Sequence, residues 1–198
     1  FILALSYFNK KWLAILLMII SVGIHKSMIL PTFAFLSILF YRNTKFYILI
    51  WLLSIPVSLL SGKYWENLFG DLGFDDRLSY FTTQADIASF SSTGFRWDFL
   101  LYSSIPILVG YYVVIKRKYN SVIYSYLLNV YIISNAFWIL IIRANFSDRF
   151  AYLSWFLYPV VLLYPLLKFP LWKHQYVKVA WVLMLQFSFT YFMWLIGK

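Results

Sequence analysis

A short polar stretch between two long apolar runs holds two arginines, an asparagine and an aspartate: Arg143, Asn145, Asp148 and Arg149. A guanidinium group is always charged, and its planar fork binds phosphate through paired hydrogen bonds. An aspartate can orient such a fork or take up a proton. A tight turn in which Asn145 or Ser147 caps the next helix and Asp148 favours its N-terminus explains part of this composition. It does not explain why two arginines stand together there.

A histidine lies in the sequence GIHKS at 23–27, between two apolar arms that are each shorter than a membrane span. A titratable group carried to membrane depth is costly, which makes it a functional candidate. The imidazole of His25 can take a proton from a hydroxyl near neutral pH, and Lys26 beside it is a candidate contact for phosphate. The alternative is a polar turn that hydrogen-bonds its own backbone.

A third polar segment, GFRWD at 94–98, leads into an apolar run. Arg96 can grip a phosphate while Trp97 offers an aromatic floor for a sugar ring. The alternative is an interfacial anchor, in which Trp97 lies at the membrane surface and Arg96 and Asp98 are solvated.

The sequence gives little support for a metal site or for a catalytic cysteine or serine nucleophile. Asp75 and Asp76 are adjacent carboxylates, but no third ligand is in register with them, so we expect no metal site and no cofactor. Cysteine is absent. The chain contains no phosphate-cradling glycine loop, zinc-protease helix or serine elbow.

The composition places these residues in a membrane protein. Of 198 residues, 63% are hydrophobic and only 12% are charged, whereas a soluble domain carries about a quarter charged residues. A chain with so little charge cannot coat a globule with polar surface. A soluble enzyme, a disordered protein and a nucleic-acid-binding module are therefore excluded, and the lipid bilayer is the expected surrounding.

The apolar residues 12–41 are interrupted at 25–27 and predict a helical hairpin with arms at 12–24 and 28–41. A single helix of this length would measure about 45 Å, too long for a hydrocarbon core of about 30 Å. Further spans are predicted at 46–61, 97–115, 120–142, 150–167 and 178–196.

The hairpin separates the charges cleanly. One side then holds no acidic residue and all of the following basic ones: Lys10, Lys11, Arg42, Lys45, Lys116, Arg117, Lys118, Lys168, Lys173 and Lys178. The other side holds every acidic residue and an equal number of basic ones. The positive-inside rule makes the first side cytoplasmic, so the three polar segments are expected to face outward.

We therefore expect an all-α, polytopic transmembrane helical bundle of about seven spans, forming a single domain over 1–198. The apolar start at 1–8 is interpreted as the end of a further, truncated span, and hence the chain as a fragment. The outer loop 62–96 contains an apolar stripe at helical spacing, which predicts an amphipathic helix at about 74–90 on the membrane surface.

Three stretches resemble the EpsG family of Wzy-type polymerases of bacterial exopolysaccharide and O-antigen: GIHKS at 23–27, GFRWD at 94–98 and NFSDRFAY at 145–152. The resemblance extends over about 10–170 and implies a GT-C-like, metal-independent glycosyltransferase in the bacterial cytoplasmic membrane, with its active site on the outer side. Its substrate would be an undecaprenyl diphosphate-linked oligosaccharide, and other polysaccharide-assembly membrane proteins are candidate partners.

The residues fit this chemistry, because fixed positive charge aimed at a leaving diphosphate lowers the barrier. The candidates for that charge are Arg96, Arg143 and Arg149. His25 is the candidate base or a diphosphate donor, and Asp148 orients an arginine or is the base instead. The candidate contacts to sugar and diphosphate are Trp97, Tyr80, Lys26 and Asn145.

Two other functional classes stay open. A flippase or transporter of polyprenol-linked saccharides would need a polar path from both sides, whereas the inner halves of the spans are apolar. A membrane acyltransferase would place its histidine near an acidic residue or an asparagine, whereas His25 is followed by Lys26 and Ser27.

Overall fold

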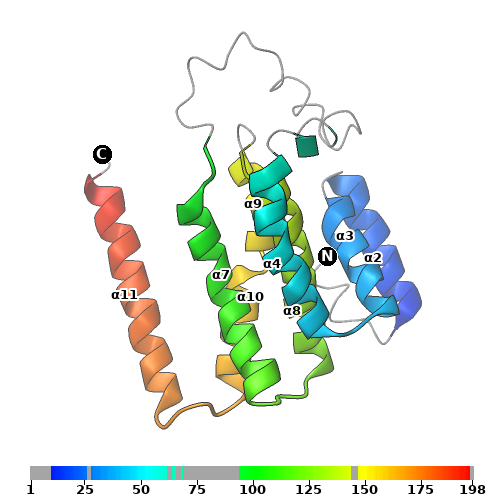
Figure 1. The fold of residues 1–198 in the computed structure, drawn as a ribbon. Helices are drawn as coiled ribbons and strands as arrows, with labels where there is room; N and C mark the ends of the chain where they lie inside the picture. Colours follow the sequence, from blue (N-terminus) through cyan, green and yellow to red (C-terminus); the bar gives the residue numbers. More distant parts are fainter. Residues whose placement is uncertain are drawn as a thin grey trace.

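The computed structural model describes residues 10–25, 28–61, 64–65, 68, 94–143 and 147–196. All regular secondary structure in these ranges is helical. The principal helices are shown in Figure 1: α2 (Lys11–Ile24), α3 (Ile29–Phe40), α4 (Thr44–Ser61), α7 (Trp97–Tyr111), α8 (Val122–Leu140), α9 (Ser147–Trp155), α10 (Tyr158–Lys168) and α11 (Gln175–Ile196). The amphipathic helix predicted at 74–90 and the apolar start at 1–8 lie outside the described residues.

The apolar stretch 12–41 forms two helices side by side, as predicted, and not one long helix (Figure 1). Helix α2 ends at Ile24 because His25 adopts an extended backbone conformation. The backbone N–H of Met28 then donates to the His25 carbonyl at 2.9 Å, directly before α3 begins. The chain reverses at the point where the polar residues interrupt the apolar pattern.

Four segments are long and apolar enough to cross a membrane: Thr44–Ser61, Trp97–Lys116, Val122–Leu140 and Phe150–Lys168. Helices α2 and α3 and the apolar part of α11 are shorter. The prediction of an all-α chain is confirmed for the described residues, and four of the predicted spans have the length and apolar composition that crossing a membrane requires. Each coincides with a predicted span to within a few residues.

The span predicted at 150–167 is divided into α9 and α10, with a turn at 156–157. Proline 159 stands at the start of α10. A proline lacks the backbone N–H that would bond the carbonyl four residues earlier, and its ring clashes with that carbonyl. Helix α9 ends at Trp155, and α10 starts afresh with Pro159 in its first turn, where a proline is tolerated.

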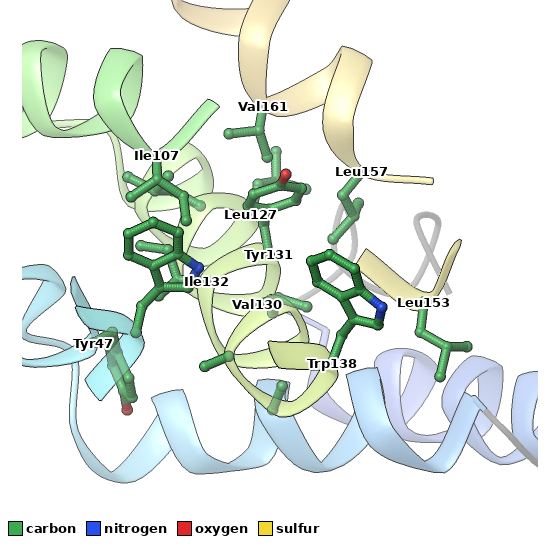
Figure 2. Close-up of a cluster of buried hydrophobic side chains, with 14 of the residues drawn as sticks. Tyr47, Ile107, Leu127, Val130, Tyr131, Ile132, Trp138, Leu153, Leu157 and Val161 are labelled. Carbon is green, nitrogen blue, oxygen red and sulfur yellow. The ribbon is translucent and has the colours of Figure 1, made fainter. Parts of the chain in front are cut away.

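Helix α8 is the centre of the bundle and packs against α3, α4, α7, α9 and α10. Figure 2 shows Ile107 and Val161 close to Leu127 and Tyr131 of α8, and Leu153 beside Trp138 of the same helix. The side chains of α8 are largely buried on all sides. This accounts for a helix whose apolar side chains are distributed all round it instead of forming a single stripe.

The bundle has two distinct ends. At one, which we call the hairpin end, α2, α4 and α8 finish and α3, α7 and α9 begin (Figure 1). The opposite end, called the basic end, holds the connections 41–43, 117–121 and 169–174 (Figure 1). All ten basic residues that the sequence assigned to one side lie at or beside these connections or at the start of α2. All three predicted site segments adjoin the hairpin end.

The packing of α7 on α8 predicts that Gly110 tolerates no side chain. A Cβ atom at Gly110 would lie 2.4 Å from Cδ1 of Leu128, and Leu128 is fully buried. Overpacking costs about 1–3 kcal/mol, and alanine regains up to about 1 kcal/mol of helix propensity. We therefore expect Gly110→Ala to lower the free energy of unfolding by about 1–2 kcal/mol, measured by circular dichroism during titration with sodium dodecyl sulfate.

Gly23→Ala is the matched control, because a Cβ atom at Gly23 meets nothing within 4 Å. It should leave stability unchanged or raise it slightly. Equal effects of the two substitutions would contradict the close contact between α7 and α8.

Candidate functional site

The guanidinium group of Arg143 binds the end of α4. Its Nη1 donates to the Ser58 carbonyl oxygen at 3.0 Å, and its Nη2 donates to the Leu59 carbonyl oxygen at 3.5 Å. The last four carbonyls of a helix have no partner within it, and the helix dipole makes this end negative. Arg143 follows α8 directly and therefore ties the ends of α4 and α8 together.

The segment before α7 contacts Arg143 through an aromatic ring. The Arg143 guanidinium lies over Phe95, with 5.7 Å between the guanidinium carbon and the ring centroid. Phe95 packs in turn on Trp97, with 4.5 Å between their ring centroids. Trp97 is 56% exposed, so one side of its indole is available to a ligand. The structure thus brings Arg143 and Trp97, 46 positions apart in the sequence numbering, around one phenylalanine.

Arg96 is held in one orientation by two neighbours. Its Nε donates to Asp98 Oδ1 at 3.0 Å and its Nη2 donates to Asp98 Oδ2 at 2.7 Å. The guanidinium carbon lies 3.7 Å from the ring centroid of Phe99. The sequence interpretation left Arg96 and Asp98 as phosphate contact or solvated anchor. The structure shows an ion pair on an aromatic floor, in which a planar guanidinium is pre-oriented.

Behind this ion pair, α7 and α9 share an aromatic cluster that sequence analysis missed. Trp155 packs edge-on against Phe99 and Tyr102, with 5.2 Å between centroids in each case. Tyr102 stacks on Tyr158 at 4.5 Å. Aromatic residues recur at i, i+3 on both helices, at 99 and 102 and at 152 and 155, and this spacing could have revealed two facing aromatic edges.

A second feature missed by sequence analysis is a buried chain of polar side chains. The Trp51 indole N–H donates to Asn135 Oδ1 at 2.7 Å, and Asn135 Nδ2 donates to Ser154 Oγ at 3.1 Å. Ser154 Oγ donates to the Ala151 carbonyl at 2.9 Å. This chain joins α4, α8 and α9 in the interior. An asparagine within an apolar span was the signal, because such a side chain usually bonds across helices.

His25 lies at the hairpin end, where the chain turns from α2 into α3, and its side chain is exposed. Its backbone N–H donates to the Ser21 carbonyl at 3.2 Å, which closes the last turn of α2. Helix α3 packs against α8 and α9, the helices that flank the Arg143 turn. His25 and the arginines thus share one end of the bundle.

The remaining predicted site residues are less well defined. Asp148 and Arg149 lie in the first turn of α9, where a carboxylate is favoured by the helix dipole, but their side chains are outside the description. Lys26, Tyr80 and Asn145 lie outside the described residues. Within the described part of the chain, no three His, Asp or Glu side chains gather as a metal site.

Comparison with known proteins gives no relative: no family model, curated protein or solved structure matches the chain.

The two described arginines should differ in their effect on stability. Arg143→Ala frees two carbonyls at the end of α4, and we expect the free energy of unfolding to fall by about 1–2 kcal/mol. Arg96→Ala removes an ion pair at the surface, which contributes about 0–1 kcal/mol. Detergent unfolding monitored by circular dichroism measures both.

Arg143→Lys is the matched variant, since it keeps the charge near the carbonyls and should recover part of the loss. If Arg143→Ala left the free energy of unfolding unchanged, Arg143 would have no role in capping α4.

Proposed function

We propose that this chain is a membrane glycosyltransferase that polymerises undecaprenyl diphosphate-linked oligosaccharide units into a bacterial surface polysaccharide. One observation carries the proposal: three segments selected separately from the sequence adjoin one end of the bundle. Two of them, at 94–98 and 143, are in contact through Phe95.

The chemistry required at this end is the displacement of a diphosphate. A hydroxyl oxygen of one repeat unit attacks the anomeric carbon of another, the new glycosidic bond forms, and the bond to undecaprenyl diphosphate breaks. The hydroxyl proton passes to a base, for which His25 and Asp148 are the candidates. The leaving diphosphate carries the negative charge away, and nearby guanidinium groups stabilise its development.

The described arginines have different parts in this proposal. Arg96 is the better diphosphate ligand, because its guanidinium is oriented by Asp98 and Phe99 and is partly exposed. Arg143 is bonded to the carbonyls of α4, so it acts mainly by adding positive charge and by holding the turn before α9. Arg149 and Asp148, at the start of α9, complete the proposed set, and Trp97 stacks on a sugar ring.

The proposed topology has about seven spans, with the basic end in the cytoplasm and the hairpin end outside, in the bacterial cytoplasmic membrane. The accumulation of basic residues at one end supports this orientation through the positive-inside rule. Helices α2 and α3 would form a short hairpin whose tip reaches the outer face through a water-filled recess.

Single cysteines in this cysteine-free chain test the orientation. Ser61→Cys reports on the hairpin end, and Asn120→Cys on the basic end. Asn120 is exposed and preferable to its neighbour Ser121, whose hydroxyl caps α8 by accepting from the Tyr124 N–H. An impermeant maleimide added to intact cells should label the first position, and the second only after permeabilisation. The reverse pattern would contradict the outward-facing site.

Substitution of His25 tests the chemistry. In cells that depend on this protein for polymer synthesis, we expect His25→Ala to abolish long polymer and to accumulate the lipid-linked repeat unit, as seen on gels of extracted polysaccharide. Glutamine donates a hydrogen bond but takes up no proton at neutral pH. Partial rescue by His25→Gln would therefore identify a donor, and no rescue would identify a base.

The other histidine supplies the control. His174 lies in the connection before α11 at the basic end and has a positive φ of 55°, a conformation that asparagine tolerates well. His174→Asn should leave polymer length unchanged. A His25→Ala protein that inserts normally and still makes full-length polymer would remove His25 from the catalytic site.

A further inference from the structure

The basic end of the bundle carries positive charge that the chain does not balance. Of the seven acidic residues, Asp98 and Asp148 lie in the first turns of α7 and α9 at the hairpin end, and the other five belong to the connection between α4 and α7. The basic side chains described at the opposite end are all exposed: Lys10, Arg42, Lys45, Lys116, Arg117, Lys118, Lys168, Lys173 and Lys178. Their counter-charge therefore comes from outside the chain.

Several of these cations stand where a helix favours an anion. Helices α2 and α4 begin at the basic end, and the start of a helix is the positive end of its dipole. Lys10 directly precedes α2, Arg42 lies two residues before α4, and Lys45 lies in its first turn. Neither first turn contains an acidic residue. The dipoles of α2 and α4 thus disfavour these basic side chains and favour a bound anion beside them.

The starts of α2 and α4 and the end of α3 share one side of the basic end, which we call the basic corner (Figure 1). Helices α2 and α3 are in contact, and only residues 41–43 separate α3 from α4. The Arg42 guanidinium carbon lies 5.4 Å from the ring centroid of Tyr126, a buried side chain of α8. An exposed and always charged group is therefore held on a fixed aromatic ring.

Exposed apolar side chains adjoin the cations of the basic corner. Trp12 is 87% exposed and Phe40 is 91% exposed. Tyr41 and Phe46 are also exposed, and their rings pack edge-on with 4.9 Å between centroids. A soluble acidic partner would cover only the charges. An anionic phospholipid carries a phosphodiester and hydrocarbon in one molecule, and aromatic side chains are typical of the depth at which its headgroup lies.

We propose that the basic corner binds an anionic phospholipid, with its phosphodiester at Arg42 and Lys45 and its acyl chains against Phe40 and Phe46. Lys10 adds positive charge from the start of α2. The bound phosphate offsets the repulsion between these cations and the two helix starts. This site lies at the end of the bundle opposite to the hairpin end, so the inference goes beyond the proposed catalysis and does not depend on it.

Native mass spectrometry of the purified protein in neutral detergent tests this inference. The probes are dioleoylphosphatidylglycerol and dioleoylphosphatidylcholine, which have the same acyl chains and differ in net charge. We expect phosphatidylglycerol to bind at least about tenfold more tightly, since each basic residue near a phosphate contributes about fivefold. Raising the salt from about 0.1 M to about 0.5 M should weaken this preference, because the attraction between exposed charges is screened.

Substitutions locate the site. The pair Arg42→Gln and Lys45→Gln should lower the affinity for phosphatidylglycerol at least about tenfold and leave that for phosphatidylcholine unchanged. The pair Lys116→Gln and Lys168→Gln is the matched control and should have a much smaller effect. It removes the same charge from the same end of the bundle, but at the ends of helices, where the dipole already favours a cation. Circular dichroism checks that each variant is folded.

Equal binding of the two lipids by the unsubstituted protein, or equal losses in the two pairs of variants, would overturn the basic corner as a phospholipid site. Competition with soluble anions needs no variant. Glycerophosphoglycerol has the same phosphodiester without acyl chains, and polyglutamate imitates an acidic protein. Both should displace phosphatidylglycerol far less effectively than the lipid itself. If either displaced it equally well, the partner would be a soluble anion and not a lipid. These measurements do not involve polymer synthesis, so the substitution of His25 is judged separately.

Discussion

The amide of Asn135 is the interaction on which the arrangement at the hairpin end depends. It accepts from Trp51 on α4 and donates to Ser154 on α9, so one buried side chain of α8 fixes both neighbours. Within a bilayer no water competes for such groups, so a hydrogen bond between interior side chains of different helices helps to fix how those helices pack. Because α4 ends and α9 begins at the hairpin end, their relative register sets where Arg143 and the first turn of α9 lie.

The same requirement shapes the ends of the helices. Arg143 satisfies carbonyls at the end of α4. At the basic end, Gln175 uses its whole amide: its Oε1 accepts from the N–H groups of Leu171 and Trp172, and its Nε2 donates to the carbonyls of Leu166 and Phe169. The side chains of Arg143 and Gln175 thus hydrogen-bond to backbone groups that have no partner within a helix, because the helix ends there. Arg143 and Gln175 therefore stabilise the ends of helices, whatever further role they have.

A functional role can be built on this structural one. A guanidinium that stays in place because it caps a helix or pairs with Asp98 is already oriented when a ligand arrives, and less ordering entropy is lost on binding. The ring of Phe99 stacks against the guanidinium group of Arg96, and the ring of Phe95 lies against that of Arg143. The hairpin end thus combines fixed guanidinium groups with an exposed indole, which is the arrangement that the proposed recognition of a phosphate beside a sugar would use.

The sequence by itself determined the class of protein, most helix positions and the hairpin. These depend on local properties: apolar content, the length of each apolar run and the polar interruption at 25–27. It also singled out Arg96 and Arg143, because charge at the edge of an apolar run is visible without a fold. It did not reveal that the span at 150–167 would divide before Pro159, because a proline alone does not decide this: Pro56 and Pro106 lie inside helices that continue.

Only the tertiary structure decided which groups meet. The contacts of Arg143 with Ser58 and Leu59, and of Trp51 with Asn135, join residues more than eighty positions apart, and no local pattern specifies such pairs. The aromatic cluster around Trp155 likewise arises where separate helices pack. A sequence shows which side chains a helix carries, but the face that each helix turns to its neighbours follows from the packing of all of them around α8.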